Sequence, residues 1–558
     1  MKFFFVCLTL TLTATIAWAG NEKLAQELRG RDAGETVDVI VQYHQSPGAA
    51  QHQRVAGKGG QLRHQLSVVK GNHYRMTAAA AQELAEDPEV AFISPDRPVF
   101  AHLDQADVTI GANLAASYNV NGAGVGIAII DSGIGDVDDL NGRVVYSHNF
   151  TSGASQDNFG HGTHVAGIIA GSGQSSTGSD YYRTIKGIAN GVKLIDLKVL
   201  DDNGSGSDSL VIQAIQQAIA LKNTYNIKVI NLSLGRPVAG SYKQDPLCQA
   251  VEAAWNSGIV VVVAAGNYGR TNPTTTYGYG TITAPGNDPY VITVGAMKDM
   301  GTPGKIDDMI ATYSSKGPTL YDMVAKPDLV APGNLIASNR SQSSNLVNQY
   351  PLVGIPMNAY KITYNTGNST DYMQLSGTSM ATPMVSAAAA LILQQHPTMT
   401  PDQVKARLMK TSSKSFPKTS SYTDPATGIV YQSQYDIFTV GAGYLDIGSA
   451  LFNNDLAPAS YSAASPALQV NAGGTISFVN GQNVVWGSNV VWGSNVVWGS
   501  NVVWGSSNLF LSAANVVWGS NVVWGSNVVW GSNVVWGSNV NSAGIADKAG
   551  SILTVMEQ

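Results

Sequence analysis

The chain has 558 residues, a length that allows two to four domains and a large hydrophobic core. Charged residues make up 13% of it, against roughly 25% in an average soluble protein, and its formal net charge is -6. Because there is no long basic run, we exclude nucleic acid and anionic membranes as partners.

Residues 1–19 predict a secretory signal peptide. Lys2 precedes an apolar stretch over residues 3–16, and AWA at 17–19 matches the small-x-small pattern of a signal-peptidase site. The apolar stretch is short for a membrane span of about 20 residues, and no later stretch is long enough for one. We therefore expect a secreted or extracellular protein, free or attached to a cell surface, with no transmembrane segment.

Only two cysteines are present, and Cys7 would leave with the signal peptide. The remaining Cys248 could then form no intramolecular disulfide. It lies at the start of an apolar helical pattern, which favours a small buried side chain over a nucleophile.

Residues 20–104 predict a small α+β unit. Segments 37–44, 66–76 and 90–99 are typical of strands, and 77–90 is typical of a helix that begins with a Thr cap.

Residues 105–451 alternate apolar runs with helical patterns. The expected strands are 124–130, 192–200, 228–234 and 258–267, and the expected helices are 165–171, 208–222 and 247–256. Continuous β-branched runs between helices are typical of buried parallel strands. We therefore predict an α/β fold with a doubly wound, mainly parallel sheet, whose chemistry lies at the carboxyl ends of the strands.

The tail, residues 452–558, repeats the hexapeptide NVVWGS four times in 483–506 and four times in 515–538. GSN supplies turn chemistry in each repeat, so strands should be short VVW pieces. A β-rich solenoid or meander, or a low-complexity extension, fits this pattern, and a helix does not. Exposed tryptophans could bind a surface or a glycan.

Three polar residues stand at the ends of predicted elements. Asp131 follows the apolar run in IIDSGI, His161 opens GHGTHVAGIIAG, and Ser379 begins an Ala-rich helix in SGTSMATP. Singly, each has a structural explanation, such as a turn or a helix cap. Together, Asp, His and Ser in this chain order, each in its own extended motif, are far more specific than any one of them.

His164 offers a competing metal-site interpretation, because it lies three residues after His161. Zinc-peptidase helices use H-E-x-x-H, whereas Gly162 and Thr163 stand between these histidines. A structural hydrogen-bonding role is the better interpretation of His164.

The chain resembles the subtilisin family. The resemblance runs in order through IIDSGI, GHGTHVAG, VLDDNGSGS, INLSLG, VAAGN, SSKGP, KPDLVAPG and GTSMATP, up to residue 451. The α/β-hydrolase pattern differs in residue order, and Ala381 replaces the last glycine of its G-x-S-x-G motif. The resemblance implies that Ser379 is the nucleophile, His161 its base and Asp131 the acid that orients the imidazole. It further implies that Asn267 contributes to the oxyanion hole.

Substrate contacts are also implied by the resemblance. One edge of the peptide-binding cleft corresponds to Gly204, Ser205 and Gly206, and the opposite edge to Ser233, Leu234 and Gly235. The primary pocket corresponds to Ala264, Ala265 and Gly266, with Gly286 near its base. Without an acidic wall residue the pocket should prefer apolar side chains or be broad, although Thr283 stands where the family commonly has a smaller residue.

The region from 37 to 98 resembles the family's inhibitory propeptide, with cleavage expected near residues 98–106. Five of the nine histidines lie in or beside it: His44, His52, His64, His73 and His102. Their clustering suggests pH-dependent release as a hypothesis, with ordinary surface residues as the simpler explanation.

No cofactor is expected for catalysis. Calcium often stabilises the family, and Asp139 matches a ligand position approximately. The loop that would supply other ligands is replaced by residues 172–187, so this site is only a candidate. An insertion at 338–372 is longer than usual before the nucleophile and could reach the cleft rim.

The sequence thus predicts a secreted serine endopeptidase that cleaves protein or peptide substrates through an acyl-enzyme and is made as a self-inhibited precursor. Two alternatives remain. In one, the chain is a surface-binding or adhesive protein whose Trp repeats are the principal functional part. In the other, it is a serine esterase, which the peptide-binding edges disfavour.

Overall fold

The computed structural model describes residues 23–25, 28–95, 102–363, 365, 367–417, 419–460 and 462–470, with four short strands beyond them. The chain divides into two compact units at the boundary between Val99 and Phe100, and each is treated by itself.

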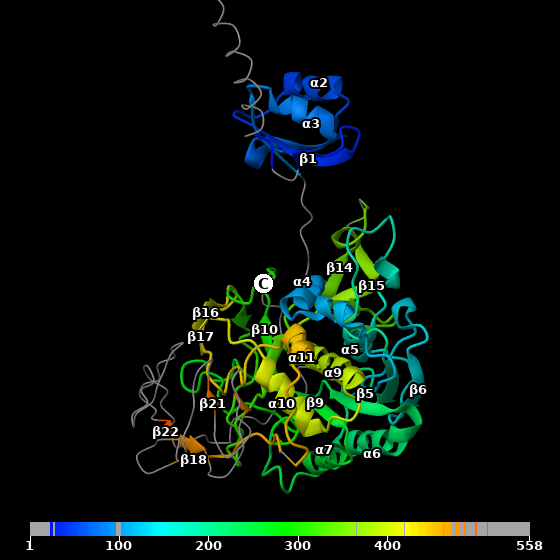
Figure 1. Ribbon diagram of the computed structural model, residues 1–558, viewed down its shortest axis with the longest axis vertical. Coiled ribbons are helices and arrows are strands. Elements are labelled where there is room, and N and C mark those ends of the chain that lie inside the picture. Colours follow the sequence, from blue (N-terminus) through cyan, green and yellow to red (C-terminus); the bar gives the residue numbers. More distant parts are fainter. Residues whose placement is uncertain are drawn as a thin grey trace, which may run out of the picture. The chain divides into compact units, whose positions relative to one another are not determined.

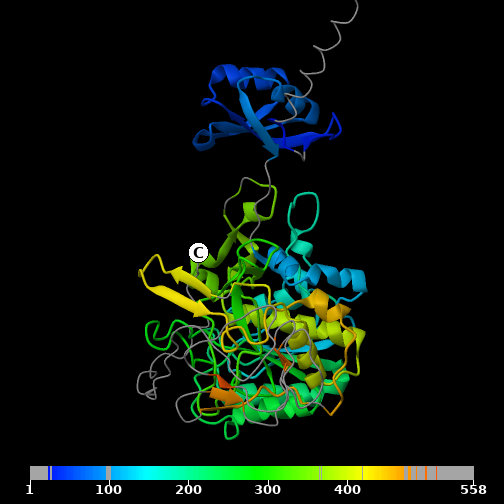
Figure 2. The ribbon, with the colours of Figure 1, turned by 60° about the vertical axis from the view of Figure 1, so that its left-hand side comes forward.

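The first unit is an antiparallel sheet with two helices on one face (Figures 1 and 2). Its strands lie in the order β2-β3-β1-β4, with bounds Thr36–Tyr43 (β1), Gln61–Leu66 (β2), Gly71–Thr77 (β3) and Val90–Pro95 (β4). A short 3-10 turn, Ser67–Val69, interrupts the strand expected at 66–76. Thr77 caps α3 (Ala78–Ala85), as expected, by accepting a hydrogen bond from the Ala80 amide. The sequence did not indicate α2 (Ala49–Gly57), because its only buried residue is Val55.

The second unit contains an eight-stranded sheet with the path β11-β10-β9-β8-β5-β7-β6, while β12 also pairs with β10. Every pair is parallel except β10 with β11, which confirms the predicted fold class. The strands are β5 (Gly126–Asp131), β6 (Val144–Asn149), β7 (Lys193–Lys198), β8 (Ile227–Leu232), β9 (Val260–Ala264), β10 (Ile292–Lys298), β11 (Met309–Ile310) and β12 (Leu329–Pro332).

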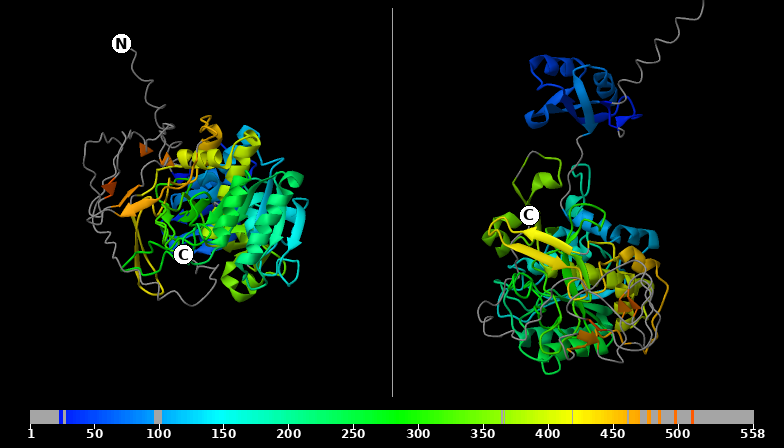
Figure 3. Two further views of the ribbon diagram at one scale, coloured as in Figure 1. Left: turned by 90° about the horizontal axis from the view of Figure 1, so that it is seen from below. Right: turned by 90° about the vertical axis from the view of Figure 1, so that its left-hand side faces the viewer.

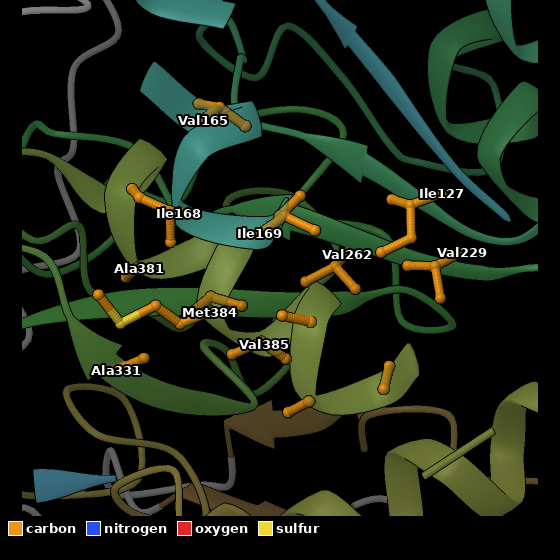
Figure 4. Close-up of a cluster of buried hydrophobic side chains, with 14 of the residues drawn as sticks. Ile127, Val165, Ile168, Ile169, Val229, Val262, Ala331, Ala381, Met384 and Val385 are labelled. Carbon is orange, nitrogen blue, oxygen red and sulfur yellow. The ribbon is translucent and has the colours of Figure 1, made fainter. Parts of the chain in front are cut away.

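Helices cover both faces of this sheet (Figure 1). One face carries α5 (His161–Ala170) and α9 (Thr378–Gln395), and the other carries α6 (Asp208–Tyr225) and α7 (Pro246–Asn256). Figure 4 shows apolar side chains of α5 and α9, among them Ile168 and Met384, packed toward sheet residues such as Val262. All of these side chains are buried. This close-packed apolar contact fixes α5 and α9 against the sheet.

Shorter elements complete this unit. The 338–372 insertion contributes most of a three-stranded sheet in the order β13-β15-β14, and β16 with β17 forms a hairpin, yellow in Figures 2 and 3. Their bounds are β13 (Ile336–Asn339), α8 (Asn345–Gln349), β14 (Gly354–Pro356), β15 (Asn368–Leu375), β16 (Thr419–Thr423) and β17 (Val430–Gln434). The remaining helices are α4 (His102–Thr109), α10 (Pro401–Thr411) and α11 (Ile447–Phe452), with 3-10 turns at Ala112–Tyr118, Asp138–Leu140, Gln174–Ser176, Pro351–Val353 and Met357–Ala359.

Short strands follow in the tail: β18 (Leu468–Val470), β19 (Ile476–Phe478), β20 (Val485–Trp486), β21 (Val497–Trp498) and β22 (Phe510–Leu511). β20 and β21 are Val-Trp pieces of the first and third repeats and pair in parallel. The rest of the repeat prediction lies outside the described residues, as does the signal peptide. Among the described residues, no helix is long and apolar enough to cross a membrane.

Candidate active site

Asp131 and His161 meet at the carboxyl edge of the parallel sheet. Asp131 is the last residue of β5, and His161 is the first residue of α5. The Nδ1 atom of His161 lies 2.8 Å from Asp131 Oδ1, and both side chains are fully buried. Asp131 Oδ1 also accepts a hydrogen bond from the Ser132 amide. The carboxylate therefore fixes the imidazole tautomer, with its proton on Nδ1.

A buried carboxylate that the sequence did not reveal joins the two elements. Asp157 accepts hydrogen bonds from Ser132 Oγ, from the amides of Gly160 and Thr163, and from Thr163 Oγ1. It thus ties the turn after β5 to the first turn of α5, whose amides have no partner within the helix. The only signal in the sequence was its place four residues before His161.

The charge next to His161 controls its pKa. Burial alone lowers that pKa, but the charge and hydrogen bond of Asp131, with a smaller contribution from Asp157, outweigh burial. The pKa of His161 therefore lies above its ordinary value. An imidazolium formed during a proton transfer would be stabilised in the same way.

Ser379 is the second residue of α9, which packs against α5. Its hydroxyl donates a 3.1 Å hydrogen bond to the carbonyl of Ser233, and Ser233 Oγ donates to the carbonyl of Ser379. Among the described residues, Nε2 of His161 has no hydrogen-bond partner. The structure therefore joins Asp131 directly to His161 and places Ser379 on the adjacent helix, without a hydrogen bond from its hydroxyl to the imidazole.

Asn267 and the start of α9 together present two hydrogen-bond donors. Asn267 Oδ1 accepts from the amide and the hydroxyl of Thr378, which identifies the other end of the side chain as the NH2 group. A methyl group on Gly377 would lie 3.3 Å from Asn267 Nδ2 and 3.6 Å from the Ser379 amide nitrogen. The missing side chain of Gly377 thus leaves open a space beside both donors.

The backbone at Gly377 is extended, with φ 161° and ψ 161°. A backbone turn is therefore not the reason for a glycine here. The reason is the open space beside Asn267 and Ser379.

Both predicted substrate edges follow the carboxyl ends of sheet strands. Residues 204–206 come after β7, and Ser233, Leu234 and Gly235 come directly after β8. A methyl group on Gly204 would lie 2.5 Å from the Phe159 ring, and one on Gly206 would lie 2.6 Å from the Val199 carbonyl. Ser205 is exposed between them. Glycine is therefore needed for close packing beneath this edge.

Thr283 lies between the second edge and the predicted pocket segment. A methyl group on Gly235 would lie 2.7 Å from Thr283 Oγ1, and one on Gly266 would lie 2.6 Å from Thr283 Cγ2. Thr283 Oγ1 donates to the carbonyl of Ala265, and a methyl group on Gly286 would meet the carbonyls of Ala264 and Thr283 at 3.0 and 3.1 Å. The structure thus groups the residues that the resemblance assigned to the pocket.

Arg236 joins the two edges, which sequence reasoning missed. Its guanidinium contacts Asp208 at the start of α6 and Asp245 before α7, with Nη2 to oxygen distances of 2.7 and 2.9 Å. Asp208 follows the 204–206 edge, and Arg236 follows Gly235. No local sequence pattern predicts these ion pairs, because the residues come from the ends of different strands.

His164 and Cys248 have the structural roles that the sequence favoured. His164 is fully buried, its Nε2 lies 2.9 Å from the Ile336 carbonyl oxygen, and burial lowers its pKa to about 3. The free thiol of Cys248 is also buried, and burial raises its pKa. Within the described part of the chain, no three His, Cys, Asp or Glu side chains form a group that could hold a metal ion.

The donors around Asp139 do not suit a cation. Oδ1 accepts a hydrogen bond from the Ser175 amide, and Oδ2 accepts from Asn339 Nδ2 and from the Tyr372 hydroxyl. Calcium would need six to eight oxygen ligands, and protein N–H and O–H groups already occupy this carboxylate.

A sequence profile of the subtilase family, peptidase family S8, matches residues 122–441, which is more than half of the chain. The chain belongs to the subtilase family. This subtilase is 37% identical over 340 residues to the serine protease AprX of Bacillus subtilis (strain 168), covering 59% of this chain and 71% of that protein. It is 34% identical over 415 residues to subtilisin E of the same strain, covering 72% of this chain and 91% of that protein.

The extracellular serine proteinase of Thermus sp. (strain Rt41A) is 35% identical to this subtilase over 344 residues, 59% of this chain and 68% of that protein. A solved structure of a cold adapted subtilisin-like serine proteinase is similar at 26% identity with a TM-score of 0.39, covering 59% of this chain and 90% of that one. The curated relatives confirm the predicted enzyme class: this subtilase is a serine-type endopeptidase, a hydrolase that acts on proteins.

Proposed function

We propose that this subtilase cleaves peptide bonds through an acyl-enzyme on Ser379. His161 Nε2 takes the proton from Ser379 Oγ as the oxygen attacks the substrate carbonyl, and later gives that proton to the leaving amine. Asp131 holds the imidazole tautomer and stabilises its charged form. The observation that carries this proposal is the buried contact between Asp131 and His161, whose Nε2 is free to take part in proton transfer.

In the proposed reaction, the negative oxygen of the tetrahedral intermediate occupies the space beside Gly377. It accepts hydrogen bonds from Asn267 Nδ2 and from the Ser379 amide. The assignment of these two donors is supported by their positions, because both nitrogen atoms lie 3.3 to 3.6 Å from the point that a methyl group on Gly377 would occupy. Thr378 supports this geometry because its amide and hydroxyl fix the orientation of Asn267. Fixed donors of this kind are commonly the largest contribution to acyl-transfer catalysis.

The substrate strand would lie between the 204–206 and 233–235 edges and bind them through its main chain. Its side chain before the scissile bond would enter the space bounded by Ala264, Ala265, Gly266 and Gly286. Thr283 narrows this space from the side of Gly235. We therefore infer a preference for small apolar side chains at this position.

We further propose that the enzyme is secreted as a precursor. The N-terminal signal pattern supports secretion, and so does the similarity to the Thermus relative, which is an extracellular serine proteinase. The first compact unit has a hydrophobic core of its own, including Val39, Tyr74 and Ile93. Such a core suits an inhibitory propeptide that folds before release. Two histidines of this unit, His64 and His73, stack with their ring centroids 5.5 Å apart. Release of the propeptide that depends on pH stays a hypothesis.

The decisive experiment compares casein hydrolysis and N-terminal processing in wild type, Ser379→Ala and Ser386→Ala. Ser386 lies farther along α9, where its hydroxyl binds Asn231, so it is a matched control on the same helix. We expect Ser379→Ala to lose about 10⁶-fold in kcat and to remain unprocessed, while Ser386→Ala keeps activity. Equal casein hydrolysis by wild type and Ser379→Ala would overturn the assignment.

A further inference from the structure

Asp139 is buried at a place where three distant segments meet. It lies in the 3-10 turn Asp138–Leu140 and is 1% exposed. The loop at 172–187 supplies the Ser175 amide at 2.7 Å, and the 338–372 insertion supplies Asn339 Nδ2 at 2.9 Å and the Tyr372 hydroxyl at 2.7 Å. Both segments depart from the family pattern, and both donate to the same carboxylate.

The two donors from the insertion are preorganised by strand pairing. Asn339 ends β13 and is directly opposite Tyr372 of β15 in the antiparallel register. Residues opposite one another project from the same face of a sheet, so both side chains approach Asp139 together. The insertion therefore closes at its base onto this carboxylate.

Tyr372 is suited to act as a lasting donor. Its side chain is fully buried, and burial together with the charge of Asp139 raises the pKa of the phenol. The hydroxyl therefore keeps its proton. It also lies 2.9 Å from Ser176 Oγ, in the loop at 172–187, so the network joins loop, turn and insertion.

The network lies against the helix that begins with His161. A methyl group on Gly167 of α5 would lie 2.5 Å from Asn339 Oδ1 and 2.3 Å from Ser338 Oγ. Ser338 Oγ also donates to the carbonyl of His164 on this helix. The base of the insertion is therefore packed directly on α5.

We propose that the base of the 338–372 insertion replaces a calcium ion at Asp139, so that hydrogen bonds from Asn339, Tyr372 and Ser175 hold this region without a cation. A calcium site needs several oxygen ligands turned inward, whereas here N–H and O–H donors face the carboxylate. The inference goes beyond peptidase activity, because it concerns how this part of the fold is stabilised.

The test measures the melting temperature of mature enzyme blocked with phenylmethylsulfonyl fluoride, in EDTA and in calcium chloride. Tyr372→Phe removes one donor from Asp139, and we expect its Tm to fall by about 2–6 °C in both solutions. Tyr360→Phe is the matched control, because this buried hydroxyl of the same insertion binds Ser369 instead. Its effect on Tm measures the general cost of removing a buried phenol hydroxyl near Asp139.

The variant Asp139→Asn distinguishes the proposal from the alternative that calcium still binds at Asp139. Calcium bound elsewhere would raise the Tm of wild type and Asp139→Asn equally, and this equal response is the expected result. If the calcium-dependent rise in Tm disappeared in Asp139→Asn, a calcium ion would bind there and the proposal would be wrong. An unchanged Tm in Tyr372→Phe would also overturn it, since the network would then contribute nothing.

Discussion

At the scale of single residues, the contact of Asp131 with His161 determines the pH range in which the base can work. His161 must be neutral to accept a proton, and the Asp131 charge raises its pKa. Activity should therefore be lost as the pH falls through that pKa. We expect Asp131→Asn to shift the acid limb of the kcat/KM profile to lower pH and to lower kcat by about 10⁴-fold.

The profile is measured with a peptide anilide on processed enzyme. Asp136→Asn is the control, because this exposed carboxylate lies in the same turn after β5. It should change neither kcat nor the acid limb by more than the experimental error. An acid limb that stayed in place in Asp131→Asn would show that another group controls it.

Gly377 allows a second prediction about the oxyanion site. In Gly377→Ala the new methyl group would occupy the space 3.3 Å from Asn267 Nδ2 and 3.6 Å from the Ser379 amide nitrogen. We expect kcat to fall by about 10²–10³-fold, as for the loss of one oxyanion donor. The extended backbone at Gly377 can accept alanine without strain, so Tm should change little.

The comparison with Asn267→Ala tests whether both variants damage the same site. If they do, the double variant Gly377→Ala with Asn267→Ala should be little worse than either single variant, because residues that act together are not additive. Fully additive losses in kcat would contradict a shared oxyanion site.

At the scale of elements, the pairing of Arg236 with Ala284 positions Thr283, the residue that we expect to control substrate specificity. Arg236 and Ala284 exchange backbone hydrogen bonds, which brings Thr283 against Gly235 and Gly266. Thr283→Gly should open the pocket. We expect the preference for Phe over Ala before the scissile bond, measured as a ratio of kcat/KM values, to rise by about 10–100-fold.

Thr283→Ser is the graded control for this prediction. It keeps the hydroxyl that donates to the Ala265 carbonyl and removes only the methyl group beside Gly266. An intermediate ratio would assign the effect to pocket volume. The same Phe to Ala ratio in all three enzymes would exclude Thr283 from the pocket.

The elements also show what the sequence could predict and why. Continuous apolar runs predicted the parallel strands, and the chain order of Asp131, His161 and Ser379, each in its own motif, identified the candidate triad. The helix α2 was missed because a single buried residue, Val55, leaves no apolar period. Asp139 and its partner Asn339 are 200 residues apart, so only the folded chain reveals that donors surround the carboxylate.

At the scale of the whole molecule, the beginning of the tail is part of the second unit. Ser465 Oγ lies 2.5 Å from Asp328 Oδ1, within a buried cluster that includes Lys326 and Lys405. Gln403 donates to the carbonyl of Ala457 in the same region. Ser465 Oγ also accepts a hydrogen bond from Lys405 Nζ at 2.9 Å, so the beginning of the tail supplies polar partners to this buried cluster.

This arrangement predicts different melting temperatures for two truncated chains. Ending the chain after Val470 should leave casein hydrolysis and Tm unchanged, because the cluster around Asp328 stays intact. Ending it after Phe452 removes Ser465 from that cluster, and unpaired buried groups are costly. We expect this shorter chain to melt at least about 5 °C lower, by calorimetry on blocked enzyme, and Ser465→Ala to lie between the two.

Equal melting temperatures for the two truncated chains would contradict a structural role of residues 453–470. The chain that ends after Val470 also isolates the repeats, since it lacks every NVVWGS unit and keeps the peptidase complete. If the repeats attach the enzyme to a surface or a glycan, this chain should be released into the medium with full kcat/KM, whereas the full-length enzyme stays bound to cells. Identical release of both would exclude attachment through the repeats. The two experiments thus test different parts of the tail. The melting temperature tests whether residues before the repeats stabilise the fold, and release into the medium at unchanged kcat/KM tests whether the repeats attach the enzyme.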